Sequence, residues 1–290
     1  MKYLVFKGWL GFGDRLETLK MCVKFAIENN LQIYVDWTDS MWSHGQESFY
    51  SYFKLTNIPQ VSSLDDIPAD ASCYPECWNN KLKQPFTEEF WRSNPSCLFS
   101  VVLNPKFMNL PVDVLVVSGV SRRSTYEDST FFSNVFKVIH PTIISEVRKR
   151  QTAFGLKKCI GIHIRGTDRL CKKGRELPIQ WMALGASSEG GLSGKPMIAV
   201  SDDQNSFEIW KRFFPQTKLM SSLSIETSFT KGNHNMDKEQ LKTSKDSLNI
   251  DCIIDFLTLA SCERIRSTYK DSRFYLEARR ISHFVDTILS

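Results

Sequence analysis

The sequence predicts an α/β protein with parallel sheets, and three observations support this. Residues 2–37 form an apolar segment, a glycine-rich loop, a segment with helical periodicity and a second apolar segment. This order is typical of the first unit of an α/β domain. The same alternation restarts after residue 140, and 290 residues suffice for two domains. We therefore expect two domains, residues 1–140 and 141–290.

In the first half, residues 2–6 (KYLVF) and 31–37 (LQIYVDW) predict strands, and "VDVLVVSG" at 112–119 predicts a third. Between the first two strands, one helical face collects the apolar residues Leu16, Leu19, Val23, Ala26 and Ile27. Residues 38–110 are rich in Trp, Phe, Pro and Asn, and no regular pattern pairs their elements.

The second half begins with a predicted helix over residues 140–154, where Pro141 suits the first turn and which we expect to act as a hinge. Polar residues 221–247 lack periodicity and predict a loop. The remaining segments predict strands at 158–166 and 195–203 and helices at 177–186, 206–214 and 248–262.

Composition excludes several classes of protein. The chain is 42% hydrophobic and 24% charged, with a net charge of +5, as in ordinary globular proteins. Its Lys and Arg residues are scattered, so we do not expect nucleic-acid binding. No segment approaches the roughly 20 apolar residues of a membrane span, and the first residues lack secretory-signal features. We therefore expect a cytoplasmic protein without a membrane span.

Eight cysteines are spread along the chain, several of them within apolar segments. This distribution favours free buried thiols over a disulfide framework. Cys73 and Cys77 have the spacing of half a zinc site, but no second pair of ligands accompanies them. We therefore predict no metal site.

The loop "GWLGFGDRL" places Gly8, Gly11 and Gly13 between a strand and a helix. Backbone amides in such a loop can receive an anion or sugar hydroxyls. Leu16 occupies the position of the third glycine in a dinucleotide-binding fingerprint, so that motif is incomplete. A tight turn that requires glycine is an equal alternative.

The segment "GIHIRGTDR" ends a predicted strand in charged residues. Alternation along the strand places His163 and Arg165 on one face and two isoleucines on the other. A guanidinium is a planar, permanently charged group that matches phosphate, so Arg165 is a candidate for binding a diphosphate. The alternative is a structural ion pair between Arg165 and Asp168, with His163 as a core residue.

Three further clusters also admit two interpretations. Asp202 and Asp203 end a strand and can bind a metal, a ribose or a base, or cap the next helix. Asp251 and Asp255 share one helical face and can mark its solvent boundary or reach a base. The turn that contains Ser267, Thr268, Tyr269 and Ser272 suits phosphate oxygens or a helix cap.

Taken in order, four stretches resemble the motifs of the fucosyltransferase superfamily, which contains the rhizobial nodulation fucosyltransferase, the α1,6-fucosyltransferase of N-glycan cores and the protein O-fucosyltransferases. They are "GFGDRL" with "YVDWTDS", then "HIRGTDR" with "LPIQWM", then "AVSDD", and finally "IDFLTLASC" with "RSTY". The resemblance extends to the nodulation enzyme in particular, because its glycine loop, helix and following strand have a similar sequence pattern. Residues 45–110 match no motif.

The resemblance implies the glycosyltransferase B architecture, two Rossmann-like domains facing a cleft. It also implies inverting transfer of L-fucose from GDP-fucose to a glycan acceptor, without a metal or cofactor. Arg165 would bind the GDP phosphates and be the residue on which catalysis most depends. The other implied substrate-binding residues are Gly11, Phe12, Gly13, Asp14 and Arg15 over donor and acceptor, His163, Thr167 and Asp168 near the nucleotide, Asp202, Asp203 and Asp255 near ribose and guanine, and Ser267, Thr268 and Tyr269 at phosphate.

Two positions depart from the family pattern. Gly166 stands where the α1,6 and nodulation enzymes carry a second basic residue, and Lys173 aligns with a glutamate proposed as a base in the α1,6 enzyme. Glu176, three residues on, is a candidate replacement. Two alternatives therefore stay open: the same fold with another donor such as a UDP-pentose, or a catalytically silent sugar-binding protein.

Overall fold

A computed structural model describes all of the 290 residues except 98–102, 104, 119–127, 167–193 and 223–242. The chain divides into two compact units, Met1–Ile139 with Thr287–Ser290, and His140–Asp286. The last four residues, expected in the second domain, thus belong with the first unit. The Lys137 ammonium contributes to this return by donating a hydrogen bond of 2.6 Å to the carbonyl of Thr287.

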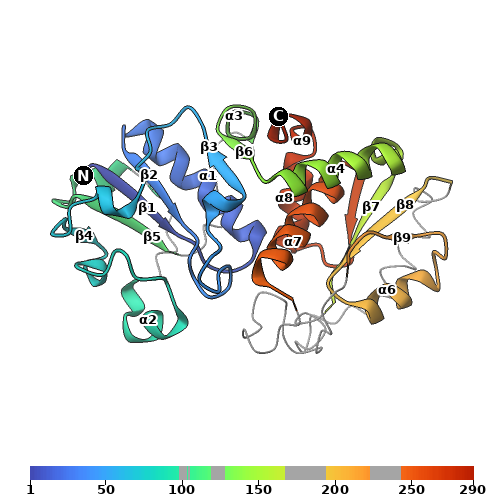
Figure 1. Ribbon diagram of the computed structural model, residues 1–290, viewed down its shortest axis with the longest axis horizontal. Coiled ribbons are helices and arrows are strands. Elements are labelled where there is room, and N and C mark those ends of the chain that lie inside the picture. Colours follow the sequence, from blue (N-terminus) through green and yellow to red (C-terminus); the bar gives the residue numbers. More distant parts are fainter. Residues whose placement is uncertain (98–102, 104, 119–127, 167–193, 223–242) are drawn as a thin grey trace. The chain divides into compact units, whose positions relative to one another are not determined.

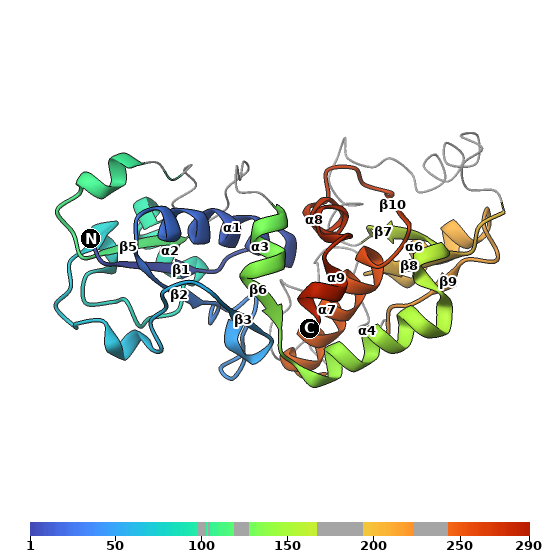
Figure 2. The same ribbon diagram turned by 90° about the horizontal axis from the view of Figure 1, so that it is seen from above.

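The first unit is built on a four-stranded parallel sheet with the order β2-β1-β5-β4 (Figures 1 and 2). Strands β3 and β6 do not join this sheet and form a separate two-stranded antiparallel sheet. The described elements are β1 (Tyr3–Lys7), α1 (Phe12–Glu28), β2 (Gln32–Asp36), β3 (Phe53–Leu55), β4 (Cys73–Tyr74), α2 (Glu88–Ser93), β5 (Val114–Ser118), α3 (Asp128–Asn134) and β6 (Phe136–Val138).

The main sheet of this unit is buried on both faces, as a parallel sheet requires. Every residue of β5 is buried, and in β1 all residues after Tyr3 are buried. Helix α1 contacts β1 and β2, while residues between β2 and β5 build a core around Trp78 and Phe86 against Val5, Val114 and Val116. The three strands predicted in this half are therefore confirmed.

A buried lysine explains how the irregular segment before α2 is attached to this sheet. The Lys7 ammonium is 1% exposed and pairs with Asp36 at 2.5 Å. It also donates to the carbonyls of Leu82 and Gln84, at 2.6 and 2.8 Å. Burial lowers the pKa of Lys7, an effect that Asp36 opposes. Because these acceptors are backbone carbonyls about 75 residues further along the chain, no sequence pattern predicts the contacts.

The second unit also has a four-stranded parallel sheet, with the order β10-β7-β8-β9 (Figure 1). Ile160 on β7 pairs in register with Met197 on β8 and Arg264 on β10. Its elements are α4 (Pro141–Phe154), β7 (Ile160–Ile164), β8 (Met197–Ser201), α6 (Gln204–Lys211), β9 (Lys218–Leu219), α7 (Lys245–Ala260), β10 (Arg264–Ser267), α8 (Arg273–Ile281) and α9 (Val285–Ile288).

Helices cover both faces of this second sheet. Ile160, Ile162 and Ile164 of β7 share one core with the aromatic side chains of α6 and the residues after it. On the other face, α7 approaches so closely that a Cβ atom on Gly161 would lie 3.0 Å from Leu259 and 2.9 Å from the Cys262 sulfur. The predicted alternation along β7 is therefore confirmed for the isoleucines.

Most predicted elements of the second half are found, with their ends shifted by a few residues. Helix α7 begins at Lys245 rather than at residue 248, because Ser244 caps it by accepting the amide hydrogen of Ser247. The helix expected at 177–186 lies outside the described residues, as does most of the polar segment 221–247. No helix in the described part of the chain is long and apolar enough to cross a membrane.

One cysteine prediction is wrong. Cys77 and Cys97 form a disulfide across 20 residues, whereas free thiols were expected. Five other described cysteines are free, and four of them are buried. Spacing could not reveal the pair, because the chain between Cys77 and Cys97 folds back through α2 and two short 3₁₀ turns to bring them together.

Candidate functional site

Polar residues gather at the carboxyl end of the second sheet, where its strand order reverses. The chain proceeds from β7 outward through β8 to β9, and then returns through α7 to place β10 on the other side of β7. The ends of β7 and β10 therefore form a topological switch point, the place where open α/β sheets bind ligands. His163, Arg165 and residues 267–269 all lie there.

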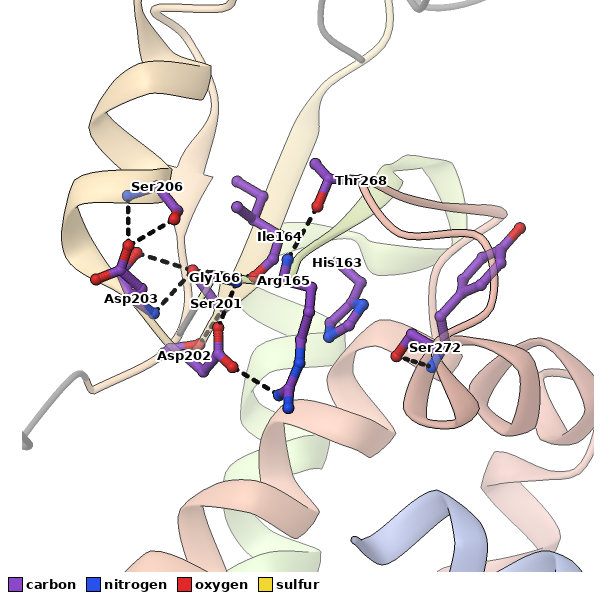
Figure 3. A network of polar contacts seen from close by, with 12 residues as sticks. His163, Ile164, Arg165, Gly166, Ser201, Asp202, Asp203, Ser206, Thr268 and Ser272 are labelled. Atoms are coloured by element: carbon purple, nitrogen blue, oxygen red, sulfur yellow. Dashed lines mark hydrogen bonds and ion pairs between the residues drawn. The ribbon is translucent and has the colours of Figure 1, made fainter. Parts of the chain in front are cut away.

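Arg165 follows the last residue of β7 and reaches toward the end of β8 (Figure 3). Its Nη1 donates to Asp202 Oδ2 at 2.6 Å, and the two side chains are 20% and 14% exposed. Thr167 and Asp168, and with them the ion pair considered from the sequence, lie outside the described residues. Asp202 thus supplies a partner that sequence spacing did not suggest.

Thr268 fastens Arg165 to β10 through the backbone. The Thr268 amide donates to the His163 carbonyl at 3.0 Å, and the Thr268 hydroxyl oxygen accepts the Arg165 amide hydrogen at 2.9 Å. Thr268 therefore prolongs the β7–β10 ladder by one step and is only 6% exposed. This geometry fixes the backbone from which the Arg165 side chain projects.

His163 is a buried, neutral imidazole beside Arg165. Burial, and next the charge of Arg165, lower the pKa of His163 to about 4, with Asp202 opposing the shift. Its ring stacks on Phe274 of α8, and its Nδ1 lies 2.9 Å from the Ser267 hydroxyl. We assign the ring proton to Nδ1, because this tautomer leaves the single hydroxyl hydrogen of Ser267 for the Tyr269 carbonyl.

Ser267 uses its hydroxyl within the turn. The Ser267 oxygen accepts the Tyr269 amide hydrogen at 3.1 Å and donates to the Tyr269 carbonyl at 2.9 Å. Ser272 caps α8 by accepting the amide hydrogen of Tyr275. The helix-cap alternative is therefore confirmed for Ser272, while phosphate binding by this turn stays a prediction.

Asp203 has the geometry of a helix cap. It is 3% exposed, and its carboxylate accepts the Ser206 amide and hydroxyl hydrogens at 2.8 and 2.5 Å. Ser201 supports the same turn by accepting the Asp203 amide hydrogen at 3.1 Å. Of the two neighbouring carboxylates, Asp203 caps α6 and Asp202 meets Arg165.

Asp255 joins three segments instead of lying at a strand end. Its carboxylate accepts Arg150 Nη1 from α4 at 3.1 Å and the Ser221 hydroxyl, which follows β9, at 2.5 Å. Burial raises the pKa of Asp255 to about 6, while the hydrogen bond from Ser221 and the charge of Arg150 oppose the rise. These contacts give Asp255 a structural place in the second unit.

Arg15, expected to close over the substrates, lies in the interior of the first unit. It is fully buried, and its guanidinium makes two hydrogen bonds to Asp39, at 2.7 and 2.8 Å. The rings of Trp37 and Trp42 each lie 5.3 Å from the guanidinium carbon. The described contacts of Arg15 are therefore structural ones within the first unit, and the substrate contact that the resemblance implied stays a prediction.

Phe12 is also a core residue, stacked on Trp42 at 5.8 Å and on Phe53 at 5.7 Å. Gly13 is buried in the first turn of α1, while Gly11 and Asp14 are half-buried at the start of that helix. Only these two residues of the predicted loop set thus remain near the surface.

Sequence reasoning missed Phe274, because its contact with His163 depends on how α8 packs. Ser206 was also missed, because nothing in the sequence distinguishes it from other serines near aspartates as the residue that donates to Asp203. Among the residues that the structure describes, no group of three or more His, Cys, Asp or Glu side chains can hold a metal ion.

The chain thus contains two Rossmann-like units, with a polar cluster at the switch point of the second sheet, the usual place of a ligand site in such a fold. Comparison with solved structures specifies the fold further. A crystal structure of NodZ α1,6-fucosyltransferase co-crystallised with GDP is similar over 96% of this chain and 92% of its own, with a TM-score of 0.66 and 18% identity.

Two other solved structures have the same fold. POFUT1 in complex with GDP matches 96% of this chain and 94% of its own, with a TM-score of 0.55 and 11% identity. A mutant of Arabidopsis thaliana FUT1 in complex with GDP matches 97% of this chain and 68% of its own, with a TM-score of 0.54 and 11% identity. No protein-family model matches the sequence, and no curated protein is significantly similar to it.

The chain therefore has the glycosyltransferase B fold of these fucosyltransferases along nearly its whole length. The predicted fold class is confirmed, and the resemblance drawn from four motifs is confirmed at the level of the fold.

Proposed function

We propose that the protein is an inverting glycosyltransferase that moves L-fucose from GDP-fucose to a hydroxyl of a glycan, without a metal ion. The fold supports this proposal, since the similar NodZ and POFUT1 structures bind GDP. The observation that carries it is the position of Arg165, a partly exposed guanidinium at the switch point of the second sheet.

This reaction requires a group that stabilises developing negative charge. As the bond between fucose and the diphosphate breaks, charge develops on the diphosphate oxygens while the sugar becomes cationic. A fixed guanidinium stabilises that charge, and a preorganised donor of this kind is typically worth about 3–4 kcal/mol. Arg165 has this role in the proposal, whereas the backbone amides of Thr268 and Tyr269 are already engaged by the His163 carbonyl and the Ser267 hydroxyl.

His163 contributes an uncharged hydrogen-bonding group. Its pKa of about 4 keeps the imidazole neutral near pH 7, so it adds no second positive charge beside Arg165. With Nδ1 bonded to Ser267, Nε2 carries the lone pair and is the nitrogen that can accept a hydrogen bond from the nucleotide.

The test is a transfer assay with GDP-fucose and a panel of glycan acceptors, in which nucleotide release and the anomeric configuration of the product are measured. The proposal predicts GDP release that depends on the acceptor, continues in EDTA and gives the inverted anomer. Retention of configuration, or a requirement for Mg²⁺, would contradict it.

Two other results would replace the donor or the activity. Release of UDP from a UDP-pentose, with no reaction of GDP-fucose, would keep the fold and change the donor. Glycan binding without nucleotide release from either donor would indicate a silent sugar-binding protein. The alternative donor is considered because Gly166 stands where the α1,6 and nodulation enzymes carry a second basic residue.

A further inference from the structure

The carboxylate of Asp202 has two different partners on its two oxygens (Figure 3). Oδ1 accepts the Gly166 amide hydrogen at 2.8 Å, and Oδ2 accepts Nη1 of Arg165 at 2.6 Å. The backbone bond fixes the carboxylate, and the fixed carboxylate then fixes the guanidinium. Hydrogen bonds between ionised groups are both short and directional, so this arrangement restricts the Arg165 side chain.

Gly166 permits this arrangement because it lacks a side chain. A Cβ atom at this position would lie 2.5 Å from Asp203 Cβ and 2.6 Å from the Ser206 hydroxyl oxygen. Asp203 and Ser206 form the cap of α6 and are almost fully buried. Any other residue at position 166 must therefore displace the start of α6, and with it Asp202, which immediately precedes the cap.

Charge alone would make Asp202 unfavourable at a site for an anion. A carboxylate beside the guanidinium lowers the positive potential that a diphosphate would experience. A positioning role predicts the opposite effect, because a guanidinium that is already oriented loses less conformational entropy when it binds. Removal of the Asp202 charge should therefore strengthen diphosphate binding if the electrostatic penalty dominates, and weaken it if the positioning role dominates.

We propose that Asp202 and Gly166 are positioning residues that orient the Arg165 guanidinium for the diphosphate of the donor, and that Asp202 does not itself contact the nucleotide. This inference rests on the proposed function and assigns Asp202 a role other than the ribose or base contact that the sequence resemblance implied.

The test compares the GDP affinity of the wild type, Asp202→Asn, Arg165→Ala and the double variant, by calorimetry and, for weak binding, by ligand-observed NMR. Gly166 and Arg165 donate to different oxygens of Asp202, and an asparagine in the same orientation replaces one of these oxygens by an NH2 group, which cannot accept. We expect Asp202→Asn to weaken GDP binding about tenfold, the effect typical of one hydrogen bond between charged groups. In the Arg165→Ala background the same change should alter affinity less than about twofold.

Two results would overturn the proposal. Equal or tighter GDP binding by Asp202→Asn would show that charge outweighs positioning. An equal loss in the wild-type and Arg165→Ala backgrounds would show that Asp202 contacts the nucleotide directly. Glu263→Gln is the matched control, because it removes one carboxylate charge from an exposed pair with Lys195 in the same unit.

Folding and function are separated by further measurements. Thermal unfolding accompanies each titration, and Asp202→Ser replaces Asp202→Asn if the latter does not fold. If the wild type binds inorganic pyrophosphate but not GDP, the proposed function fails, and the same four proteins then test the positioning role with pyrophosphate. If the wild type binds neither, the positioning role is refuted as well.

Discussion

His163 shows how one residue can make stability depend on pH. In the unfolded chain its pKa is 6.5, and in the folded protein burial and Arg165 lower the pKa to about 4. Between these values the unfolded state binds a proton that the folded state does not. The contribution of His163 to stability is therefore complete above pH 6.5 and is lost as the pH falls toward 4.

We predict that His163→Asn removes this dependence. The asparagine amide can donate to Ser267 as Nδ1 does, but it does not titrate. Relative to the variant, the wild type should lose about 3 kcal/mol of unfolding free energy between about pH 7 and about pH 4, measured by urea denaturation at a series of pH values.

Asp255 titrates in the same range with the opposite sign, because its pKa is raised to about 6. Its contribution is present in both proteins and cancels in the comparison. Parallel curves of unfolding free energy against pH for wild type and variant would contradict the burial and charge assigned to His163.

The loop between β1 and α1 is built around a buried ion pair rather than an open binding surface. Arg15 Nε also donates to the carbonyl of Leu10 at 2.9 Å, and Leu10 has a positive φ of 65°. The guanidinium thus holds a backbone conformation that a leucine rarely adopts. Replacing Arg15 would leave Asp39 charged, buried and without this partner.

We predict that Arg15→Met lowers the unfolding free energy by about 3–5 kcal/mol, the typical cost of breaking a buried pair. Guanidinium chloride denaturation measures this. The exposed pair Lys83–Asp65 provides the control, since Lys83→Met should change stability by less than about 1 kcal/mol. Equal effects of the two variants would contradict the enclosure of Arg15.

Gly8 tests the packing of the same element. A Cβ atom there would lie 2.1 Å from Nη1 of Arg15 and 2.3 Å from Trp37 Cδ1, both on buried side chains. At Gly11, three residues on, the nearest neighbour is 3.9 Å away. The two glycines share a loop but differ in the space around them.

We therefore expect Gly8→Ala to destabilise the protein by about 1–3 kcal/mol and Gly11→Ala to change it little, as measured by thermal unfolding. A larger effect at Gly11 than at Gly8 would show that the loop packs differently. Glycine spacing alone did not reveal this difference, because Trp37 reaches Gly8 from the end of β2.

Elements with a local pattern could be predicted from the sequence, and contacts between distant segments could not. The strands β1, β5, β7 and β8 are continuous apolar segments, so their burial is visible in the sequence. The two-residue strand β4 has no such pattern, and its place in the sheet depends on the pairing of Cys73 with Val114.

The same division applies to the candidate site. Alternation along β7 predicted that His163 and Arg165 share one face, and the end of the apolar segment placed them at the carboxyl end of the strand, where parallel sheets bind ligands. Nothing in the sequence indicated that Asp202, rather than Asp203, meets Arg165, because the choice depends on which carboxylate caps α6. The enclosure of Arg15 by Trp37, Asp39 and Trp42 was not visible in the sequence for a similar reason.

At the scale of the whole chain, the match to fucosyltransferase structures extends over nearly all residues despite low sequence identity. Buried strands tolerate exchange among apolar residues of similar volume, so a fold can persist while its sequence diverges. A specific binding group tolerates less, because a lysine cannot reproduce the geometry of an arginine. The central claim is therefore best tested at Arg165.

The most direct measurement is a calorimetric titration of the wild type, Arg165→Lys and Arg264→Lys with GDP, each with and without Mg²⁺. Arg264 is an exposed arginine at the opposite end of β10 and serves as the matched control. We predict that the wild type and Arg264→Lys bind GDP equally, with or without Mg²⁺, and that Arg165→Lys binds at least about tenfold more weakly. Equal affinity of Arg165→Lys and the wild type would contradict the assignment of Arg165 as the residue that binds the diphosphate.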